Sequence, residues 1–294
     1  MPGLTAILFG SGDMGLASLD CLLEQGVELK FVVSTDSGYD WQGSLSARAK
    51  ELGIPTITDD MMLDADLLAK EPVDLLISSY FGKKISARIR AVARDCWNIH
   101  GSLLPRYRGR APINWQIING ESEGGVTIHR MTDSFDAGDI IASRKIEIDG
   151  DMSAYDLLEK GKSESAVILG DSLKLAGQSD VRLPARPQTE PASVFPGRTP
   201  ADGEFVWDWS ATRIRNLVRA LTRPYPGAFV SIENSKRLFV WWCEPDTSRP
   251  TLETGELVIV SGRCFVGTGS GTLELTDYHI EGHSQDETVQ WLRN

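Results

Sequence analysis

Two hydrophobic periods alternate along the first part of the chain. Short apolar runs typical of strands are separated by stretches in which apolar residues recur every three or four positions, as in helices. The expected strands are residues 5–9, 29–34, 74–79 and 96–99, and the expected helices are residues 14–24, 46–52, 62–70 and 86–94. This alternation predicts βαβ units and a mainly parallel sheet.

The pattern changes after residue 120. Residues 125–131 and 139–148 are expected to form two strands joined by a polar loop, and residues 153–176 a long helix. Together with the preceding elements they predict an α/β fold. Its N-terminal domain is expected to be Rossmann-like, with a mainly parallel sheet, over residues 1–185.

A proline-rich stretch separates this region from the C-terminal part. Residues 183–204 contain five prolines and no periodicity, so we expect a linker at residues 186–205. Ser210 is placed to cap a helix whose apolar residues follow helical spacing. Short strands are then expected between turns, which predicts a small OB-like β-barrel over residues 206–294: residues 228–232, 238–242, 256–260, 263–267 and 272–276.

Composition narrows the function classes. The formal net charge is −11 over 294 residues, and residues 206–294 hold nine Lys or Arg against eleven Asp or Glu. A nucleic-acid binder needs a positive surface, so nucleic acid is a disfavoured partner. The four cysteines are scattered and the four histidines lack ligand spacing, which predicts a cytoplasmic location and no metal site. No apolar run reaches membrane-spanning length and no charged leader precedes the first strand, so we expect no membrane segment and no signal peptide.

A glycine motif follows the first expected strand. Gly10, Gly12 and Gly15 form G-x-G-x-x-G in "ILFGSGDMGLASLDCLLEQG", and Asp36 stands just after the second expected strand. Between a strand and a helix this motif is typical of dinucleotide binding, so an NAD-dependent oxidoreductase is one hypothesis. The glycines also suit a tight turn with close helix packing, which leaves the role of the loop open.

A second cluster of chemistry-bearing residues lies in "CWNIHGSLLPRYRGRAPINWQIING". Asn98 and His100 stand two apart at a strand end, so their side chains share a face at the carboxyl edge of the sheet, where such sheets bind ligands. Asp136, in "HRMTDSFDAGDII", lies in a glycine-containing loop that can return over this edge. We interpret His129 as an ordinary strand residue and the tryptophans of the C-terminal part as packing residues.

The segment "NIHGSLLPRYRGRAP", followed 38 residues after Asn98 by the Asp of "FDAGD", resembles the signature of the 10-formyltetrahydrofolate-dependent formyltransferases. "LFGSGDMG" is similar to the family's first glycine loop. "FPGRTPADGEFVWDW" and "VRALTRPYPGAF" resemble its linker and the start of its C-terminal domain, so the resemblance covers nearly the whole chain. It implies a metal-free transfer of a formyl group from 10-formyltetrahydrofolate to an amine.

The resemblance also implies roles for single residues. Asn98 would donate a hydrogen bond to the oxyanion, His100 would move protons between the amine and the leaving folate nitrogen, and Asp136 would raise the pKa of His100. The folate pocket would lie between the loop after residues 74–79 and the loop that carries Asp136. The residues expected there are Lys83, Lys84, Ile85, Thr132, Asp133, Ser134 and Phe135, although an exposed helix start explains the two lysines equally well.

The acceptor depends on finer resemblances. "HGSLLPRYRGRAPINW", a short acidic loop after the second strand and "GRTPADGEFVWDW" resemble enzymes that formylate nucleotide-linked amino sugars, most of all UDP-4-amino-4-deoxy-L-arabinose. On this resemblance Arg110 is carried over to the active site, since a guanidinium suits a diphosphate. Methionyl-tRNA is the alternative acceptor. A folate deformylase and a non-catalytic binding protein are further alternatives, and a homodimer is left open.

Overall fold

The computed structural model describes residues 3–35, 40–58, 72–178, 181–189, 191–232, 236–248 and 252–292. The chain divides into two units. The first consists of Met1–Gly109, Glu123–Glu147 and Leu158–Phe195, and the second of Arg110–Ser122, Ile148–Leu157 and Pro196–Asn294. Because each unit takes three segments of the chain, this division differs in kind from one made at a single linker. The domain limits expected at residues 185 and 206 stay predictions.

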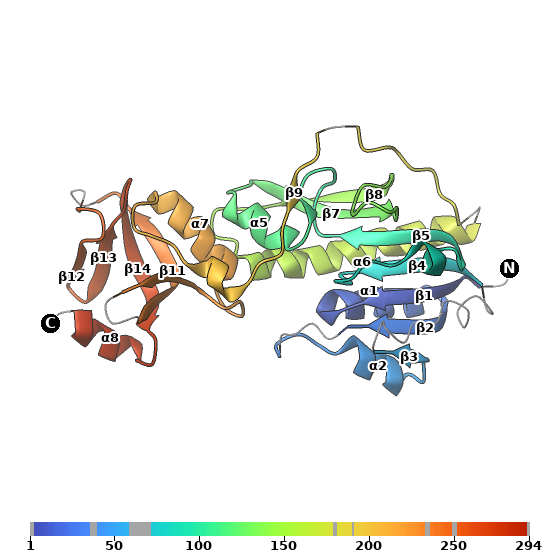
Figure 1. Cartoon of the computed structure of the whole chain (residues 1–294), viewed down its shortest axis with the longest axis horizontal. Helices are drawn as coiled ribbons and strands as arrows, with labels where there is room; N and C mark the ends of the chain where they lie inside the picture. Colours follow the sequence, from blue (N-terminus) through green and yellow to red (C-terminus); the bar gives the residue numbers. More distant parts are fainter. Residues whose placement is uncertain are drawn as a thin grey trace. The chain divides into compact units, whose positions relative to one another are not determined.

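A seven-stranded sheet forms the first unit (Figure 1). Its strand order is β3-β2-β1-β4-β5-β7-β8; the first five of these strands pair in parallel, and β7 and β8 pair antiparallel. The mainly parallel sheet predicted from the hydrophobic pattern is therefore confirmed. The strands are β1 Thr5–Gly10, β2 Glu28–Ser34, β3 Thr56–Ile57, β4 Val73–Ser79, β5 Ala93–His100, β7 Glu123–Arg130 and β8 Ile140–Glu147.

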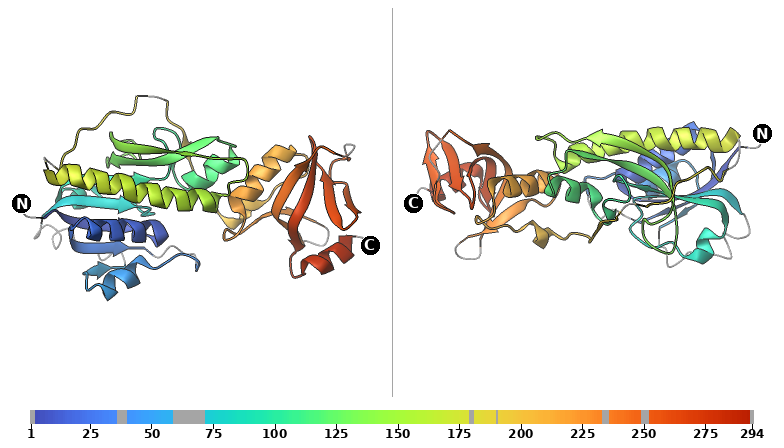
Figure 2. Two further views of the ribbon diagram at one scale, coloured as in Figure 1. Left: turned by 180° about the vertical axis from the view of Figure 1, so that it is seen from behind. Right: turned by 90° about the horizontal axis from the view of Figure 1, so that it is seen from above.

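Two helices, α1 (Gly12–Glu24) and α6 (Ala154–Gln178), cover the same face of this sheet (Figure 2). A shorter helix, α2 (Leu45–Glu51), follows β2. The helix expected over residues 86–94 is wrong in length, because α4 covers only Ala87–Arg90. Val92 next to it is buried in the core and the chain turns there into β5. The helix expected at residues 62–70 lies outside the described residues. In the described part, no helix has the length and apolar character to cross a bilayer.

The glycine loop between β1 and α1 is packed against another part of the chain. Gly12 has a φ of +55°, and a Cβ there would lie 1.9 Å from Oε1 of Gln42. A Cβ on Gly10 would lie 2.8 Å from the side chain of Leu45. The glycines therefore allow the close approach of Gln42 and Leu45 to this turn. Asp36 lies outside the described residues.

The second unit contains a five-stranded antiparallel sheet of order β10-β11-β14-β13-β12. The predicted helix that follows Ser210 is α7 (Ala211–Leu221), and the Oγ of Ser210 accepts a hydrogen bond from the backbone N–H of Arg213. Two helices, α5 (Pro112–Ile118) and α8 (Gln285–Leu292), were not expected. The small C-terminal β domain predicted from the sequence is confirmed, and its strands are β10 Ala228–Ser231, β11 Arg237–Asp246, β12 Leu257–Val260, β13 Arg263–Gly267 and β14 Thr272–Ile280.

Candidate active site

The pairing of β5 with β7 places four polar side chains on one face of the sheet. In the antiparallel register Asn98 lies opposite His129, and His100 lies opposite Thr127. Side chains that are directly opposite each other point to the same side, with Cβ atoms about 5 Å apart. The shared face predicted for Asn98 and His100 is therefore present. His129 also lies on this face, which the interpretation as an ordinary strand residue missed.

Asp136 enters this cluster from the loop between β7 and β8. One carboxylate oxygen, Oδ1, lies 3.3 Å from Nδ2 of Asn98, 3.3 Å from Nε2 of His129 and 3.6 Å from Nδ1 of His100. The other oxygen, Oδ2, accepts a hydrogen bond of 2.8 Å from the backbone N–H of Gly109. Asp136 has a φ of +51°, a conformation that costs a non-glycine residue on the order of 1 kcal/mol. The chain thus holds this carboxylate in a strained but fully bonded position.

Gln188 ties the backbone of this loop to the rest of the site. Its Nε2 donates to the carbonyl oxygens of Asp136 (2.8 Å) and Gly138 (2.7 Å), and its Oε1 accepts from the guanidinium of Arg108. Sequence reasoning missed Gln188, since it lies in the proline-rich segment where no periodicity or motif marks it. Arg108 is one of the three arginines of "PRYRGR", and its guanidinium donates to a side chain of the same protein, Gln188.

The position of a proton on His100 follows from its partner. Nε2 lies 2.7 Å from the backbone carbonyl oxygen of Tyr107, which can only accept, so Nε2 carries a hydrogen. Tyr107 has a φ of +60°. Thr127 holds the start of the loop that runs from the end of β5 to Tyr107. Its Oγ1 accepts a hydrogen bond from the N–H of Leu104 and donates one to the carbonyl of Ser102. A neutral His100 therefore presents the lone pair of Nδ1 to Asp136 and can accept a proton there.

The hydrogen-bond partners also determine the tautomer of His129 and the orientation of the Asn98 amide. Nδ1 of His129 lies 2.8 Å from the carbonyl oxygen of Arg130, so Nδ1 carries the hydrogen and Nε2 of the neutral ring is an acceptor. The Asn98 atom 3.0 Å from this Nε2 and 3.3 Å from the Asp136 carboxylate faces two acceptors and is the amide nitrogen. Both N–H groups of Asn98 thus have a partner, and the contact with Asp136 is the longer one.

The charges of the cluster are set by burial and by these contacts. Burial raises the pKa of Asp136, but the neighbouring imidazoles of His129 and His100 and the N–H of Gly109 outweigh it and lower the pKa to about 2. Burial lowers the pKa of His100, and it outweighs Asp136 and the Tyr107 carbonyl, which raise it. The expected influence of Asp136 on His100 has the right direction, but the net pKa of His100 is lowered. At neutral pH the pair is a carboxylate beside a neutral imidazole.

The residues expected in a folate pocket lie on two segments, residues 83–85 and residues 132–135. An ion pair connects the regions that carry them. Arg90 of α4 binds Asp133 at 2.5 Å, which links the segment after β4 to the loop after β7. Thr132 donates through Oγ1 to the carbonyl of Ser134, and Phe135 is 65% exposed. Lys83 and Lys84 are exposed, whereas the side chain of Ile85 packs in the core, so that only its backbone is left for a ligand. Contacts of these seven residues with folate stay predictions.

Arg110 belongs to the second unit, whereas Asn98, His100 and Asp136 belong to the first. Its side chain is exposed, and a Cβ on Gly197 would lie 3.3 Å from its Cδ and Nε. A phosphate-binding role for Arg110 stays a prediction.

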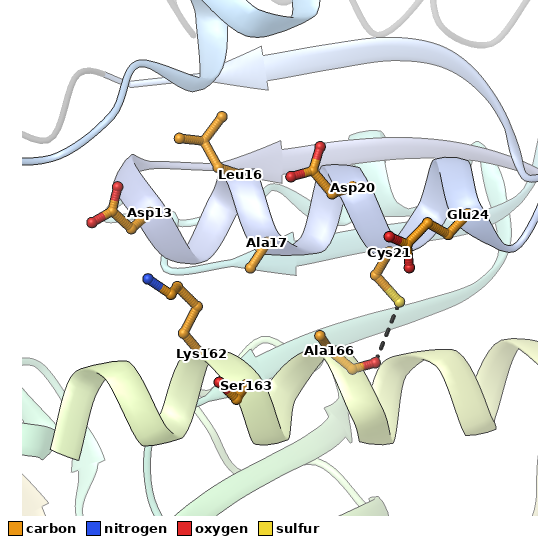
Figure 3. Close-up of a pocket in the computed structure, with 9 residues that line it drawn as sticks. All are labelled: Asp13, Leu16, Ala17, Asp20, Cys21, Glu24, Lys162, Ser163 and Ala166. Atoms are coloured by element: carbon orange, nitrogen blue, oxygen red, sulfur yellow. Dashed lines mark hydrogen bonds between the residues drawn. The ribbon is translucent and has the colours of Figure 1, made fainter. Parts of the chain in front are cut away.

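A cavity of about 410 Å³ lies between α1 and α6 and shares no residue with the cluster (Figure 3). Its wall carries Asp13, Asp20 and Glu24, and Cys21 donates a hydrogen bond to the carbonyl of Ala166. Burial raises the pKa of the Cys21 thiol to about 11, so the thiol is no nucleophile at neutral pH. The candidate site is therefore the polar cluster around Asn98, His100 and Asp136 rather than this cavity.

Comparison with known protein families assigns the whole architecture. Residues 7–172 match the family model described as formyl transferase, and residues 198–294 match the model of the formyl transferase C-terminal domain. The chain belongs to the formyl transferase family. The resemblance drawn from the segments around Asn98 and Asp136 is thereby confirmed.

Solved structures show the same fold at low sequence identity. The chain is 18% identical to an N-formyltransferase from Helicobacter canadensis, solved with folinic acid and dTDP-3-aminofucose, at a TM-score of 0.71, with 94% of this chain and all of that one covered. Against HypX from Aquifex aeolicus, solved with tetrahydrofolic acid, identity is 18% and the TM-score 0.63, and the match covers 92% of this chain and 43% of HypX. Against methionyl-tRNA formyltransferase from Clostridium thermocellum the values are 18% and 0.58, with 84% and 96% covered. This chain thus spans less than half of the length of HypX and nearly all of the other two.

Proposed function

We propose that this formyltransferase transfers the formyl group of 10-formyltetrahydrofolate to the amine of a nucleotide-linked amino sugar. The observation that carries the reaction class to this site is the convergence of Asn98, His100 and Asp136, with a lone pair of His100 and a carboxylate on the same side. An acyl transfer to an amine requires these three groups: a base that accepts the proton of the amine, a negative charge that stabilises the protonated base, and an N–H that donates to the oxyanion.

The residues act in a defined order. 10-Formyltetrahydrofolate supplies the electrophilic carbonyl. Nδ1 of His100 accepts the proton that the attacking amine loses, and the Asp136 carboxylate 3.6 Å away stabilises the imidazolium that results. Once His100 is protonated, the Asp136 carboxylate interacts more strongly with the imidazolium than with Asn98. The Asn98 N–H that faced Asp136 then becomes available for the oxygen that develops negative charge. His100 then returns the proton to the leaving nitrogen.

We expect the pterin ring to bind accessible apolar side chains of the first unit. Phe81 and Met131 are partly buried and pack against the core cluster that contains Phe9 and Leu76, so part of each apolar side chain is left accessible. Phe135, on the loop that ends in Asp136, adds exposed aromatic surface. Flat aromatic ligands bind to such apolar walls, and nearby backbone groups supply specificity. The loops at residues 83–85 and 132–135 are therefore proposed to bind folate.

Charge supports a small acceptor over tRNA. The chain carries a net charge of −11, and residues 206–294 have more acidic than basic side chains. Binding of a polyanion gains free energy from counterion release only where Lys and Arg meet phosphates. A nucleotide-linked amino sugar needs one diphosphate site, for which Arg110 is proposed. The four cysteines form no disulfide, which supports the proposed cytoplasmic location.

The test is an acceptor screen. The protein is incubated with 10-formyltetrahydrofolate and UDP- or dTDP-linked 3-amino and 4-amino sugars, and the release of tetrahydrofolate is followed by absorbance with product mass as confirmation. Methionyl-tRNA and buffer alone are the parallel reactions. Formylation of a sugar supports the proposal, formylation of methionyl-tRNA alone overturns the acceptor, and release of formate in buffer alone indicates a deformylase.

A further inference from the structure

We propose that His129 is a positioning residue of the formyl transfer: it holds one N–H of the Asn98 carboxamide, so that the other N–H is directed at the reacting carbonyl. This inference rests on the proposed function and adds a residue that the sequence signature did not include. It concerns the orientation of an amide, so part of its test does not depend on activity.

Nε2 is the one acceptor atom of the neutral His129 ring, and in the described part of the chain it lies 3.0 Å from Nδ2 of Asn98 and 3.3 Å from Oδ1 of Asp136, a carboxylate oxygen that cannot donate to it. The side chain is 3% exposed. Nδ1–H donates to the carbonyl of Arg130 at 2.8 Å, and Nε2 accepts from Nδ2 of Asn98 at 3.0 Å. The ring lies edge-on to His100 with 6.5 Å between the centroids, so the two imidazoles do not stack. His129 therefore contacts Asn98, the residue proposed to donate a hydrogen bond to the oxyanion, whereas His100 is the residue proposed to accept the proton.

The carbonyl that fixes the His129 ring is itself held in place. The side chain of Arg130 donates to both oxygens of Asp95 at 3.1 and 3.0 Å, and Asp95 also accepts from Nε1 of the buried Trp97. The backbone of Gly138 approaches the Arg130 carbonyl so closely that a Cβ would lie 1.9 Å from its oxygen. The position of Nε2 is thus set by the strand and by a buried ion pair rather than by a flexible loop.

The Asn98 carboxamide needs such an anchor because its terminal torsion has broad, roughly two-fold wells. Asp136 also favours the nitrogen in the observed place, but its charge is drawn to His100 once His100 is protonated. At that moment the bond to His129 is the contact that keeps the amide from turning. A turned amide would present its oxygen, instead of an N–H, to the developing oxyanion.

Two substitutions of nearly the same size separate this role from simple packing. Glutamine can place an amide oxygen near the position of Nε2, whereas asparagine reaches only the position of Nδ1. We expect His129→Asn to lower kcat about 10- to 100-fold with each KM within about threefold of wild type, as for an interaction made in the transition state. His129→Gln should recover most of that loss at equal Tm. Equal kcat in the two variants, or a loss confined to KM, would overturn the proposal.

A double-mutant cycle and a spectrum complete the test. In the Asn98→Ala background His129→Asn should cost less than about threefold, because its partner is gone; an unchanged cost overturns the proposal. In the wild type, long-range 1H–15N spectra of the four histidines above about pH 8 should show the Nδ1–H tautomer for His129 and the Nε2–H tautomer for His100. An Nε2–H tautomer of His129 also overturns it. The spectrum reads the anchor even if no sugar is formylated, so the two proposals fail separately.

Discussion

Replacing Asp136 by asparagine changes the size of the side chain little, but it removes one charge and the oxygen that accepts from Asn98. The amide oxygen can still accept the N–H of Gly109, which the carboxylate binds at 2.8 Å, so the loop keeps its anchor. The carboxylate is buried, with 10% of its side chain exposed, and its oxygen lies 3.6 Å from Nδ1 of His100. The variant therefore tests how much the counter-charge contributes once His100 has taken the proton.

The distance sets the size of the effect. Two unit charges 3.6 Å apart interact by about 4 to 5 kcal/mol at an effective dielectric constant of 20, so loss of the carboxylate removes up to that much from the protonated state of His100. This corresponds to a decrease of kcat by up to about a thousand- to five-thousandfold. Asp136 raises the pKa of His100, so its removal lowers that pKa further below its ordinary value. The acidic limb of the kcat/KM profile, where His100 becomes protonated, should therefore move to lower pH.

The assay is the release of tetrahydrofolate between about pH 5 and 9, at saturating and limiting acceptor. Asp139→Asn is the matched control, because Asp139 is an exposed carboxylate on the same loop, and it should stay within about threefold of wild type. A decrease of less than tenfold for Asp136→Asn, together with an unmoved acidic limb, would refute the reasoning that the charge supports His100.

Four further predictions follow from the same contacts. Asn98→Ala should lower kcat about 100- to 1,000-fold with little change in KM, measured by steady-state kinetics. Gln188→Ala leaves the carbonyls of Asp136 and Gly138 without their donor, and it should lower the free energy of unfolding in urea by about 1 to 3 kcal/mol and reduce kcat. Gly138→Ala forces the Arg130 carbonyl to move and should destabilise the protein by more than about 2 kcal/mol, seen as a lower Tm; a Tm within a degree of wild type would contradict the close approach. The pKa of Asp136 is about 2 in the folded state against 3.8 ordinarily, so the carboxylate contributes about 2 kcal/mol of stability above pH 4 that is lost as the pH falls toward 2. The stability difference between wild type and Asp136→Asn should therefore shrink below pH 4.

Local patterns were enough to predict most of the sheet and the face that Asn98 and His100 share. A two-residue spacing on a strand fixes a common face, whatever the neighbouring strand is. The partner of β5 is a long-range property, and His129 could be recognised as part of the site only once β7 was known to pair with β5 in this register. Even so, the alternation of Thr127 and His129 with Val126 and Ile128 marks a polar face that a pairing argument could have used.

Other features had no signal in the residues. Gln188 is a polar residue in a proline-rich segment, and its three partners lie 50 to 80 positions away. The helix α5 follows Ala111, which has a φ of +50° that no alanine predicts. The sign of the pKa change of His100 also needed the structure, because the charge of Asp136 is readable from the sequence but the depth of burial that outweighs it is not.

The antiparallel pairing of β5 and β7 also determines when the active site becomes ordered. Asn98 and His129 are directly paired in this antiparallel ladder and His100 lies two residues further along β5, so their mutual positions are fixed as soon as the two strands pair. The conformational entropy of these side chains is then lost once, during folding, and not at each turnover. Binding has to order only the substrates and the exposed part of the loop that ends in Asp136. The same frame can accordingly serve acceptors of different shape, as long as the loops around it position their amine against His100.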